Sequence, residues 1–256
     1  EELTDLSAGF TRCGSVTVAR TRERLDALQR QASKARSWGL DADEVAASKV
    51  ADLCGGILDP DVFVGGIHLP ADGKVDASNV CNLFAAASRL LDAQLCEGVQ
   101  VLGIVNEGNG FVVCTNAGDV KARCLVNCAG QWARKVGKLS GVNVPLHSCQ
   151  HFYVYSRPGG SLAVPRDFPV VRDPDSWLYS REWSGGLLVG SFEPNAKFVF
   201  EHSEIPPKFE FQLLENDWDH FLPYLESACE AFPALASAEV DLLNGPESFT
   251  FDGRYL

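Results

Sequence analysis

The feature of this sequence that most constrains the fold is a junction within residues 123–142, which read RCLVNCAGQWARKVGKLSGV. The apolar run 123–128 predicts a strand, and it passes through Ala129 and Gly130 into a predicted helix that ends at a glycine. Small residues at such a junction let another molecule, often a nucleotide, press against the backbone. Close packing of the strand against the helix would also favour small residues, so the junction alone allows both interpretations.

Composition excludes several classes of partner. A chain of 256 residues, 46% of them hydrophobic, can bury one large core or two interleaved ones. Its formal net charge of -12 argues against binding to nucleic acid or to an anionic membrane surface. The nine cysteines include no C-x-x-C pair, so the usual spacing of a structural zinc site is missing and a reducing compartment is favoured.

The ends of the sequence predict an internal stretch of a longer protein. The chain contains no methionine, even at position 1, and it stops just after a turn-like segment. No apolar run is long enough for a membrane-spanning helix, and the first ten residues have neither a basic nor an apolar targeting region.

The middle of the chain has the pattern of an α/β layer. Asp76 is suited to cap a helix over residues 77–96, and the wide apolar face of that helix predicts packing on a sheet. We expect three strands to follow, at 99–105, 110–115 and 120–128.

Both flanks of this layer have different patterns. Residues 14–19 alternate as in a half-buried strand, and Thr21 caps a predicted helix that ends at Gly39. From residue 146 the strands are rich in aromatic residues and separated by turns, which predicts an antiparallel sheet. After Pro206 and Pro207 an amphipathic helix is expected, with these residues on its buried side: Phe211, Leu214, Trp218, Phe221 and Leu222.

Five motifs together resemble a known family. LPADGKVDASNV, LVNCAGQWA, QHFYV, LYSREWSGGLLVGSFE and NGPESFTFDG occur in the order found in D-amino-acid-oxidase-like FAD-dependent oxidoreductases, in the branch of the dimethylglycine and sarcosine dehydrogenases. Within that branch, NCAGQWA, PLHSCQHFYVYSRP and NDWDHFLP look most like the regulatory subunit of pyruvate dehydrogenase phosphatase. The resemblance covers nearly the whole chain.

The resemblance implies a D-amino-acid-oxidase-like fold of mixed α/β and α+β class. A three-layer FAD/NAD(P)-binding domain, incomplete in this chain, would be interleaved with a mixed-sheet substrate domain. We expect residues 1–66 and 146–246 in the substrate domain, residues 67–145 in the FAD-binding domain, and residues 247–256 returning toward the latter. Family members open with a G-x-G-x-x-G unit that holds the pyrophosphate, and this sequence contains none.

The same resemblance implies FAD as the cofactor. The residues expected on the cofactor side are Asn127, Ala129, Gly130 and Trp132, with Val101 expected near the adenine. The alternative is that Asn127 and Gly130 only form a tight turn while Trp132 belongs to the core, and short glycine motifs alone favour this alternative.

His151 and Tyr179 match a His–Tyr pair that amine-oxidising members place near the reactive face of the flavin. Oxidation of an N-methyl amine needs the amine neutral before hydride leaves, and a histidine can accept that proton. The alternative is a strand histidine bonded to backbone beside a half-buried tyrosine. Arg157, Arg172 and Arg181 could each bind a substrate carboxylate, and of the three we expect Arg181 to do so. The alternative is that all three are solvated or paired with acidic residues.

No metal site is predicted. Asp217, Asp219 and His220 do not share one helix face as ligands at i and i+4 would, so this segment is interpreted as a packed helix with a solvated acidic side. Cys124 and Cys128 are expected to be small buried residues on one strand face.

Three functions follow from the resemblance. The first is a regulatory or scaffold subunit, in the mitochondrial matrix, that acts on a catalytic phosphatase. The second is an FAD-dependent dehydrogenase of dimethylglycine or sarcosine. The third is a degenerate flavoprotein fold with a structural role in a larger assembly. The His–Tyr pair does not separate them, because the regulatory branch resembles the enzymes at these positions, so whether the protein is an enzyme stays open.

Overall fold

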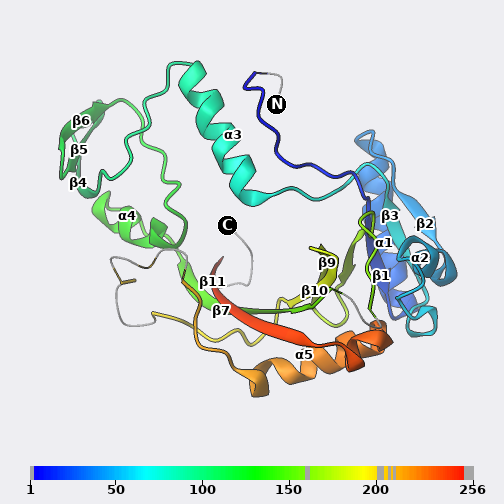
Figure 1. Ribbon diagram of the computed structural model, residues 1–256. Helices are drawn as coiled ribbons and strands as arrows, with labels where there is room; N and C mark the ends of the chain where they lie inside the picture. The colour runs from blue at the N-terminus through cyan, green and yellow to red at the C-terminus, as the bar shows by residue number, and fades with distance from the viewer. Residues whose placement is uncertain (1–2, 159–161, 201–204, 207–208, 210–211, 251–256) are drawn as a thin grey trace. The chain divides into compact units, whose positions relative to one another are not determined.

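The computed structural model describes residues 3–158, 162–200, 205–206, 209 and 212–250, with only the backbone described at 247–250 (Figure 1). The chain forms two compact units. Unit 1 consists of Glu1–Ala87, His151–Pro194 and Glu215–Asn244, and unit 2 consists of Ser88–Gln150, Asn195–Leu214 and Gly245–Leu256. Most of the predicted return segment 247–256 lies outside the described residues.

The elements, in chain order, are as follows. The strands are β1 Ser15–Ala19, β2 Asp43–Val45, β3 Gly65–Leu69, β4 Val101–Asn106, β5 Phe111–Thr115, β6 Gly118–Ala122, β7 Leu146–Ser156, β8 Val170–Asp173, β9 Leu178–Trp183, β10 Gly186–Ser191 and β11 Val240–Thr250. The α-helices are α1 Arg22–Ser37, α2 Ala47–Leu53, α3 Ala77–Leu90, α4 Ala133–Leu139 and α5 Trp218–Ala231, and the 3-10 helices are η1 Pro60–Val62, η2 Gly130–Trp132 and η3 Pro233–Ser237.

In the described part of the chain, eight strands form one mixed sheet in the order β11-β7-β10-β9-β8-β1-β3-β2. The predicted antiparallel, aromatic-rich strands are present, since β7, β10, β9 and β8 pair antiparallel. They do not form a separate sheet, because β8 pairs in parallel with β1 and so joins them to the N-terminal strands.

Alternation along these strands divides unit 1 into a core side and an open side. Phe152 and Val154 of β7 and Val189 of β10 are fully buried, together with Phe221 of α5. Between α1 and the sheet lies a second small cluster, and the predicted apolar face of α1 is confirmed at Leu25, Leu28 and Ala32. The side chain of Thr21 accepts a hydrogen bond from the Arg24 amide, so the predicted N-cap is confirmed as well.

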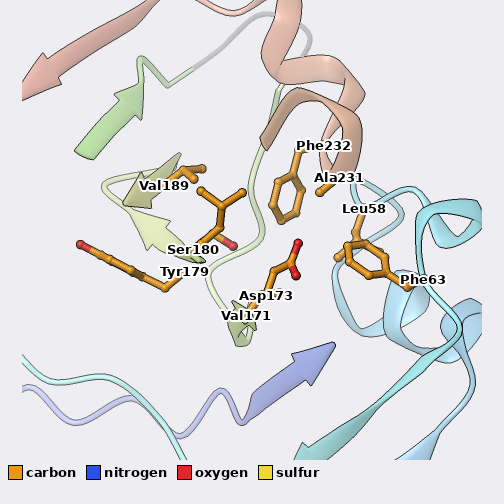
Figure 2. Close-up of a pocket in the computed structure, with 10 residues that line it drawn as sticks. Leu58, Phe63, Val171, Asp173, Tyr179, Ser180, Val189, Ala231 and Phe232 are labelled. Carbon is orange, nitrogen blue, oxygen red and sulfur yellow. The ribbon is translucent and has the colours of Figure 1, made fainter. Parts of the chain in front are cut away.

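A small void remains within this core (Figure 2). Its volume is about 10 Å³, room for about one water molecule. Figure 2 shows the Tyr179 ring pointing away from Ala231 and Phe232, toward the other side of the sheet. The void is therefore a packing defect and not a substrate pocket.

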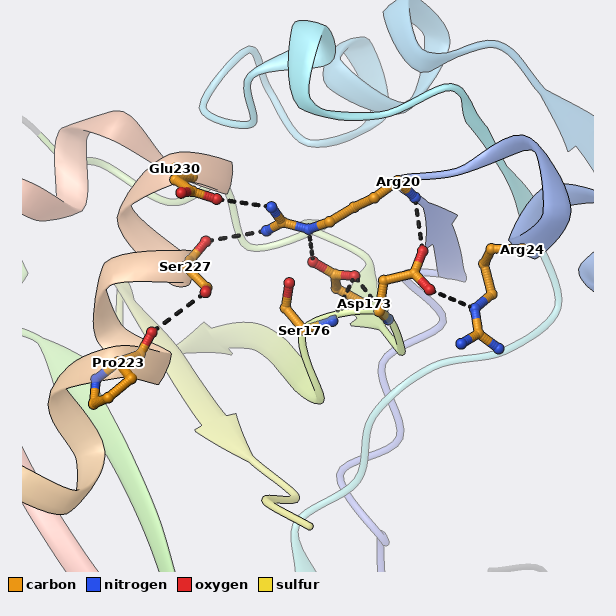
Figure 3. A network of polar contacts seen from close by, with 8 residues as sticks. Arg20, Arg24, Asp173, Ser176, Pro223, Ser227 and Glu230 are labelled. Atoms are coloured by element: carbon orange, nitrogen blue, oxygen red, sulfur yellow. Dashed lines mark hydrogen bonds and ion pairs between the residues drawn. The ribbon is translucent and has the colours of Figure 1, made fainter. Parts of the chain in front are cut away.

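A partly buried polar network joins the end of β1, the β8–β9 turn and α5 (Figure 3). The Arg20 guanidinium lies 2.8 Å from the carboxylates of both Asp173 and Glu230, and it donates to the Ser227 carbonyl at 3.2 Å. Asp173 also accepts from the amides of Asp175 and Ser176. Because the Asp173 side chain is only 5% exposed, this carboxylate depends on these partners.

The other end of α5 is held by a second polar contact. His220 Nε2 lies 3.4 Å from Glu193 Oε1, and the Glu193 side chain is almost fully buried just after β10. Burial raises the pKa of Glu193 to about 7. Asp217 caps the helix by accepting from the His220 amide.

The prediction for this helix was correct only in part. Phe221 is fully buried, but Trp218 and Leu222 are 42% and 47% exposed, because His220 and Phe221 occupy the side that faces β7. Phe211 lies outside the described residues.

Unit 2 contains the antiparallel sheet β4-β5-β6, and α4 contacts β4. The predicted strand over 120–128 was wrong beyond Ala122: residues 124–129 have no regular structure and Val126 is 78% exposed. A strand needs a hydrogen-bonded neighbour, and none of the described strands pairs with this segment. For the same reason Cys124 and Cys128 are exposed rather than buried.

Helix α3 ends at Leu90, earlier than predicted, although Asp76 caps it as expected by accepting from the Asn79 amide. None of its residues is buried, and Phe84 is 65% exposed. The expected packing of its apolar face on a sheet is thus not found among the described residues. Among the described residues, no helix is both long enough and apolar enough to cross a bilayer.

We expect the Asp173→Ala substitution to lower the free energy of unfolding by about 3 kcal/mol, because it leaves the Arg20 charge without its most buried partner. Urea denaturation measures this. The matched control is Asp26→Ala, which removes an exposed pair with Arg22 at 3.8 Å and should cost less than about 0.5 kcal/mol. Equal effects of the two substitutions would contradict a structural role for the network.

Candidate functional site

The register of three neighbouring strands brings the predicted catalytic residues together on the open side of the sheet in unit 1. Tyr179 of β9 is paired with Gly190 of β10, which is paired with Tyr153 of β7. Paired residues of antiparallel strands share a face, and His151 lies two residues before Tyr153 on that same face. His151 Nε2 and the Tyr179 hydroxyl are 2.9 Å apart, within hydrogen-bond distance.

Aromatic stacking fixes the geometry of this pair. The Phe192 ring lies 4.9 Å from the His151 ring and 4.9 Å from the Tyr179 ring, measured between centroids. The His151 and Tyr179 rings are nearly parallel, with an interplanar angle of 4°. The three rings therefore form one stacked cluster, which we call the His–Tyr cluster.

His151 is neutral over the physiological pH range. Burial lowers its pKa to about 4, because the charged imidazolium would lose its hydration. A neutral ring has one nitrogen able to accept a proton or a hydrogen bond. His151 is thus an uncharged hydrogen-bonding group and a weak base, and the Tyr179 hydroxyl is placed to orient its ring.

Of the three candidate arginines, only Arg181 faces this cluster without an acidic partner among the described residues. Arg181 and Tyr179 lie two residues apart on β9 and hence on one face. In that part of the chain no carboxylate lies within ion-pair distance of Arg181, whereas Arg157 pairs with Glu239 and Asp241, and Arg172 with Asp72. The positive charge of Arg181 also acts on Tyr153, whose pKa burial raises and this charge partly lowers again.

A second hollow in unit 1 is less suited to a substrate. It is an open cleft of about 580 Å³ whose lining includes Lys74, Arg166 and Glu182. Lys74 and Glu182 form a close ion pair, so their charges satisfy each other. No residue of the His–Tyr cluster lines this cleft.

The predicted cofactor-side residues all lie in unit 2. Asn127 Oδ1 accepts from the Ala129 amide at 3.2 Å, and its Nδ2 donates to the Ala133 carbonyl at 2.9 Å, so its side chain fixes the turn. Gly130 has a positive φ of 52°, and nothing lies within 4 Å of where a Cβ would be. Trp132 is 38% exposed rather than part of the core.

These features fit a group that approaches the backbone. The space in front of Gly130 and the exposed ring of Trp132 leave residues 129–132 accessible, as the small-residue junction predicts. Gln131 Nε2 contacts the Pro246 carbonyl of β11 at 3.4 Å, which ties the turn to the end of the described chain. Val101 is half-buried at the start of β4, paired with Thr115, so the structure assigns it no distinct role.

Sequence reasoning missed two members of the site, Phe192 and Gly190. The signal was available, because both lie in GLLVGSFE, two residues apart, and Gly190 is in register with Tyr179 on the paired strand. What the sequence did not reveal was the pairing of β10 with both β7 and β9.

The described part of the chain contains no candidate metal site. No group of three His, Cys, Asp or Glu side chains there is placed to hold an ion.

Comparison with known proteins places these features in context. Residues 1–250 match the family described as FAD dependent oxidoreductase, DAO. The chain is 35% identical over 256 residues to the mitochondrial pyruvate dehydrogenase phosphatase regulatory subunit of Mus musculus, covering 98% of this chain and 29% of that protein. It is 32% identical to the mitochondrial sarcosine dehydrogenase of Mus musculus over 263 residues, covering 100% of this chain and 28% of that protein.

Among solved structures, the L-proline dehydrogenase of P. horikoshii aligns with a TM-score of 0.79 and 20% identity, over 98% of this chain and 64% of that one. This likeness shows a shared fold. The chain spans less than a third of the length of the two curated relatives.

Burial of His151 and Glu193 makes stability depend on pH in opposite senses. The pKa of His151 is about 4 in the folded chain, against an ordinary value of 6.5, so the unfolded chain binds more protons in this window and stability falls as the pH drops. The pKa of Glu193 is about 7 in the folded chain, against an ordinary value of 4.5. Its contribution to stability is therefore full below pH 4.5 and is lost as the pH rises through 7.

Glu193→Gln removes the opposing effect of Glu193, so we expect this variant to show the loss of stability at low pH that His151 causes. Between pH 6.5 and pH 4, the free energy of unfolding of this variant should fall by about 3 kcal/mol more than that of the double variant E193Q/H151N. Urea denaturation at each pH measures the difference. Parallel pH profiles for the two variants would mean that His151 is not held neutral.

Proposed function

This chain belongs to the FAD-dependent oxidoreductase family, as its motifs predicted, and from that premise we propose that it is part of a regulatory or scaffold flavoprotein subunit. The observation that carries the proposal is the 35% identity to a pyruvate dehydrogenase phosphatase regulatory subunit across 98% of the chain. By analogy, its partner would be a catalytic phosphatase subunit. Two relatives are mitochondrial by name, and we place this protein in the mitochondrial matrix on the same analogy.

We propose that FAD is the bound cofactor and that the turn at residues 127–132 is its contact in unit 2. The backbone of Ala129 and Gly130 is open to a dinucleotide, Asn127 holds the turn in shape, and Trp132 offers an exposed ring beside it. Bound FAD would supply a two-electron acceptor. Val101 is kept as a proposed contact on the adenine side.

A second candidate function is an FAD-dependent dehydrogenase of N-methyl amino acids, with which the geometry of the His–Tyr cluster and Arg181 is compatible. A neutral His151 bonded to the Tyr179 hydroxyl places no second positive charge beside the substrate amine, which must lose its own proton before it can be oxidised. Arg181, on the same face as Tyr179, is suited to bind the substrate carboxylate. Dimethylglycine or sarcosine has both groups.

The visible absorption spectrum of the full protein separates the two candidates. We expect flavin bands in the purified protein, because residues 1–250 match the FAD-dependent oxidoreductase family. If the protein is a regulator that holds FAD structurally, anaerobic addition of dimethylglycine or sarcosine should leave the bands unchanged. Bleaching of the bands by either compound would establish the dehydrogenase, and absence of any flavin would contradict both candidates.

Under the dehydrogenase candidate, Arg181 can be tested by ligand binding. We expect Arg181→Ala to weaken binding of sarcosine by about tenfold to a hundredfold, since one charged hydrogen-bonding partner of the carboxylate is lost. Titration calorimetry measures the dissociation constant. The matched control is Arg157→Ala, whose guanidinium is exposed and paired with Glu239 and Asp241 and whose loss should leave binding unchanged. Similar effects of both substitutions would contradict the assignment.

A further inference from the structure

Gly190 lies directly beneath the Tyr179 ring. It is a residue of β10, paired across the sheet with Tyr179 of β9 on one side and Tyr153 of β7 on the other. A Cβ built on Gly190 would overlap the phenol end of Tyr179, at Cζ, Cε1 and the hydroxyl oxygen. The tyrosine ring therefore crosses β10 through space that any side chain at position 190 would fill.

This path is what allows Tyr179 to reach His151. The two residues lie on strands that are not neighbours, because β10 runs between β9 and β7. The Tyr179 side chain spans that intervening strand, and its hydroxyl ends 2.9 Å from His151 Nε2. Phe192, two residues beyond Gly190, then stacks on both rings.

Neither backbone conformation nor backbone crowding accounts for the glycine at position 190. The φ angle of Gly190 is not in the left-handed region, so the local conformation does not require glycine. No backbone atom is among the three nearest to the added Cβ, whereas at Gly186 the nearest is the Ser156 carbonyl oxygen. An alanine at 190 therefore displaces the end of one side chain and leaves the strand intact.

We propose that Gly190 is a positioning residue. Because it has no side chain, the Tyr179 hydroxyl can lie against His151 in the His–Tyr cluster. The proposal rests on the proposed ligand-binding role of the His–Tyr cluster for its functional meaning, but the positioning itself does not require flavin or turnover. Gly190 acts only through Tyr179, and it touches no substrate atom.

The experiment is a titration of His151 by NMR of the imidazole nitrogens in the full protein, with the signal assigned by its loss in His151→Gln. We expect Gly190→Ala to shift the pKa of His151 by about one unit, because the ring loses its hydrogen bond to tyrosine. Tyr179→Phe removes the same bond without altering the glycine and should shift the pKa in the same direction and by a similar amount. The double variant G190A/Y179F should show no further change beyond that of Y179F.

Gly103→Ala is the matched control. Gly103 is also a strand glycine without a left-handed φ, and an added Cβ there would make only an ordinary contact, 3.8 Å from Cys114 Cβ. It should leave the His151 titration unchanged. A shift of the His151 pKa in Y179F without one in G190A would overturn the positioning role, and additive shifts in the double variant would do so as well.

A stability cycle guards against misfolding of the single variant. Gly190→Ala should lower the melting temperature in the native background and have no effect in a Tyr179→Ala background, where the ring is absent. An equal loss in both backgrounds would overturn the proposal. If the protein lacks amine binding but the His151 titration still responds to G190A, the dehydrogenase candidate fails while the positioning role stands.

Discussion

The register of the eight-stranded sheet is the constraint on which the rest of unit 1 depends. Successive side chains of a strand point to opposite faces, so β7 and β9 contribute to the core on one side and to the His–Tyr cluster on the other. Phe152 and Val154 enter the core while His151 and Tyr153 face the cluster, all from one strand. A slip of one residue would exchange these two sets, so the apolar core fixes the geometry of the site.

Charged groups limit how this sheet and α5 can move against each other. The Arg20 guanidinium ties the end of β1 to α5, and Glu193 contacts His220 near the start of the same helix. Glu193 directly follows Phe192, the ring that stacks on both His151 and Tyr179. The helix on the core side is thus connected through one pair of adjacent residues to the cluster on the open side.

The sequence predicted those features that depend on local pattern. Alternation and capping located β1, α1 and the aromatic strands, and family resemblance selected His151 and Tyr179 from five histidines and five tyrosines. Prediction from the sequence failed where the structure of a segment depends on partners distant in the chain. The segment 123–128 is apolar enough for a strand, yet no described strand pairs with it, and the apolar face of α3 is exposed for want of a packing partner among the described residues. The role of Gly190 needed the pairing of β10 with two other strands.

The His–Tyr cluster carries an energetic penalty that bears on both candidate functions. Holding an imidazole in a buried site, where its pKa falls to about 4, gives up stability whenever the pH drops. A glycine within β10 adds to this, since a strand gains no packing from it. Apolar residues at positions 151 and 190 would make the sheet more stable. Perturbed pKa values of this kind gather at binding and catalytic sites, so the cost in stability is consistent with a ligand-binding role for the cluster under either candidate function.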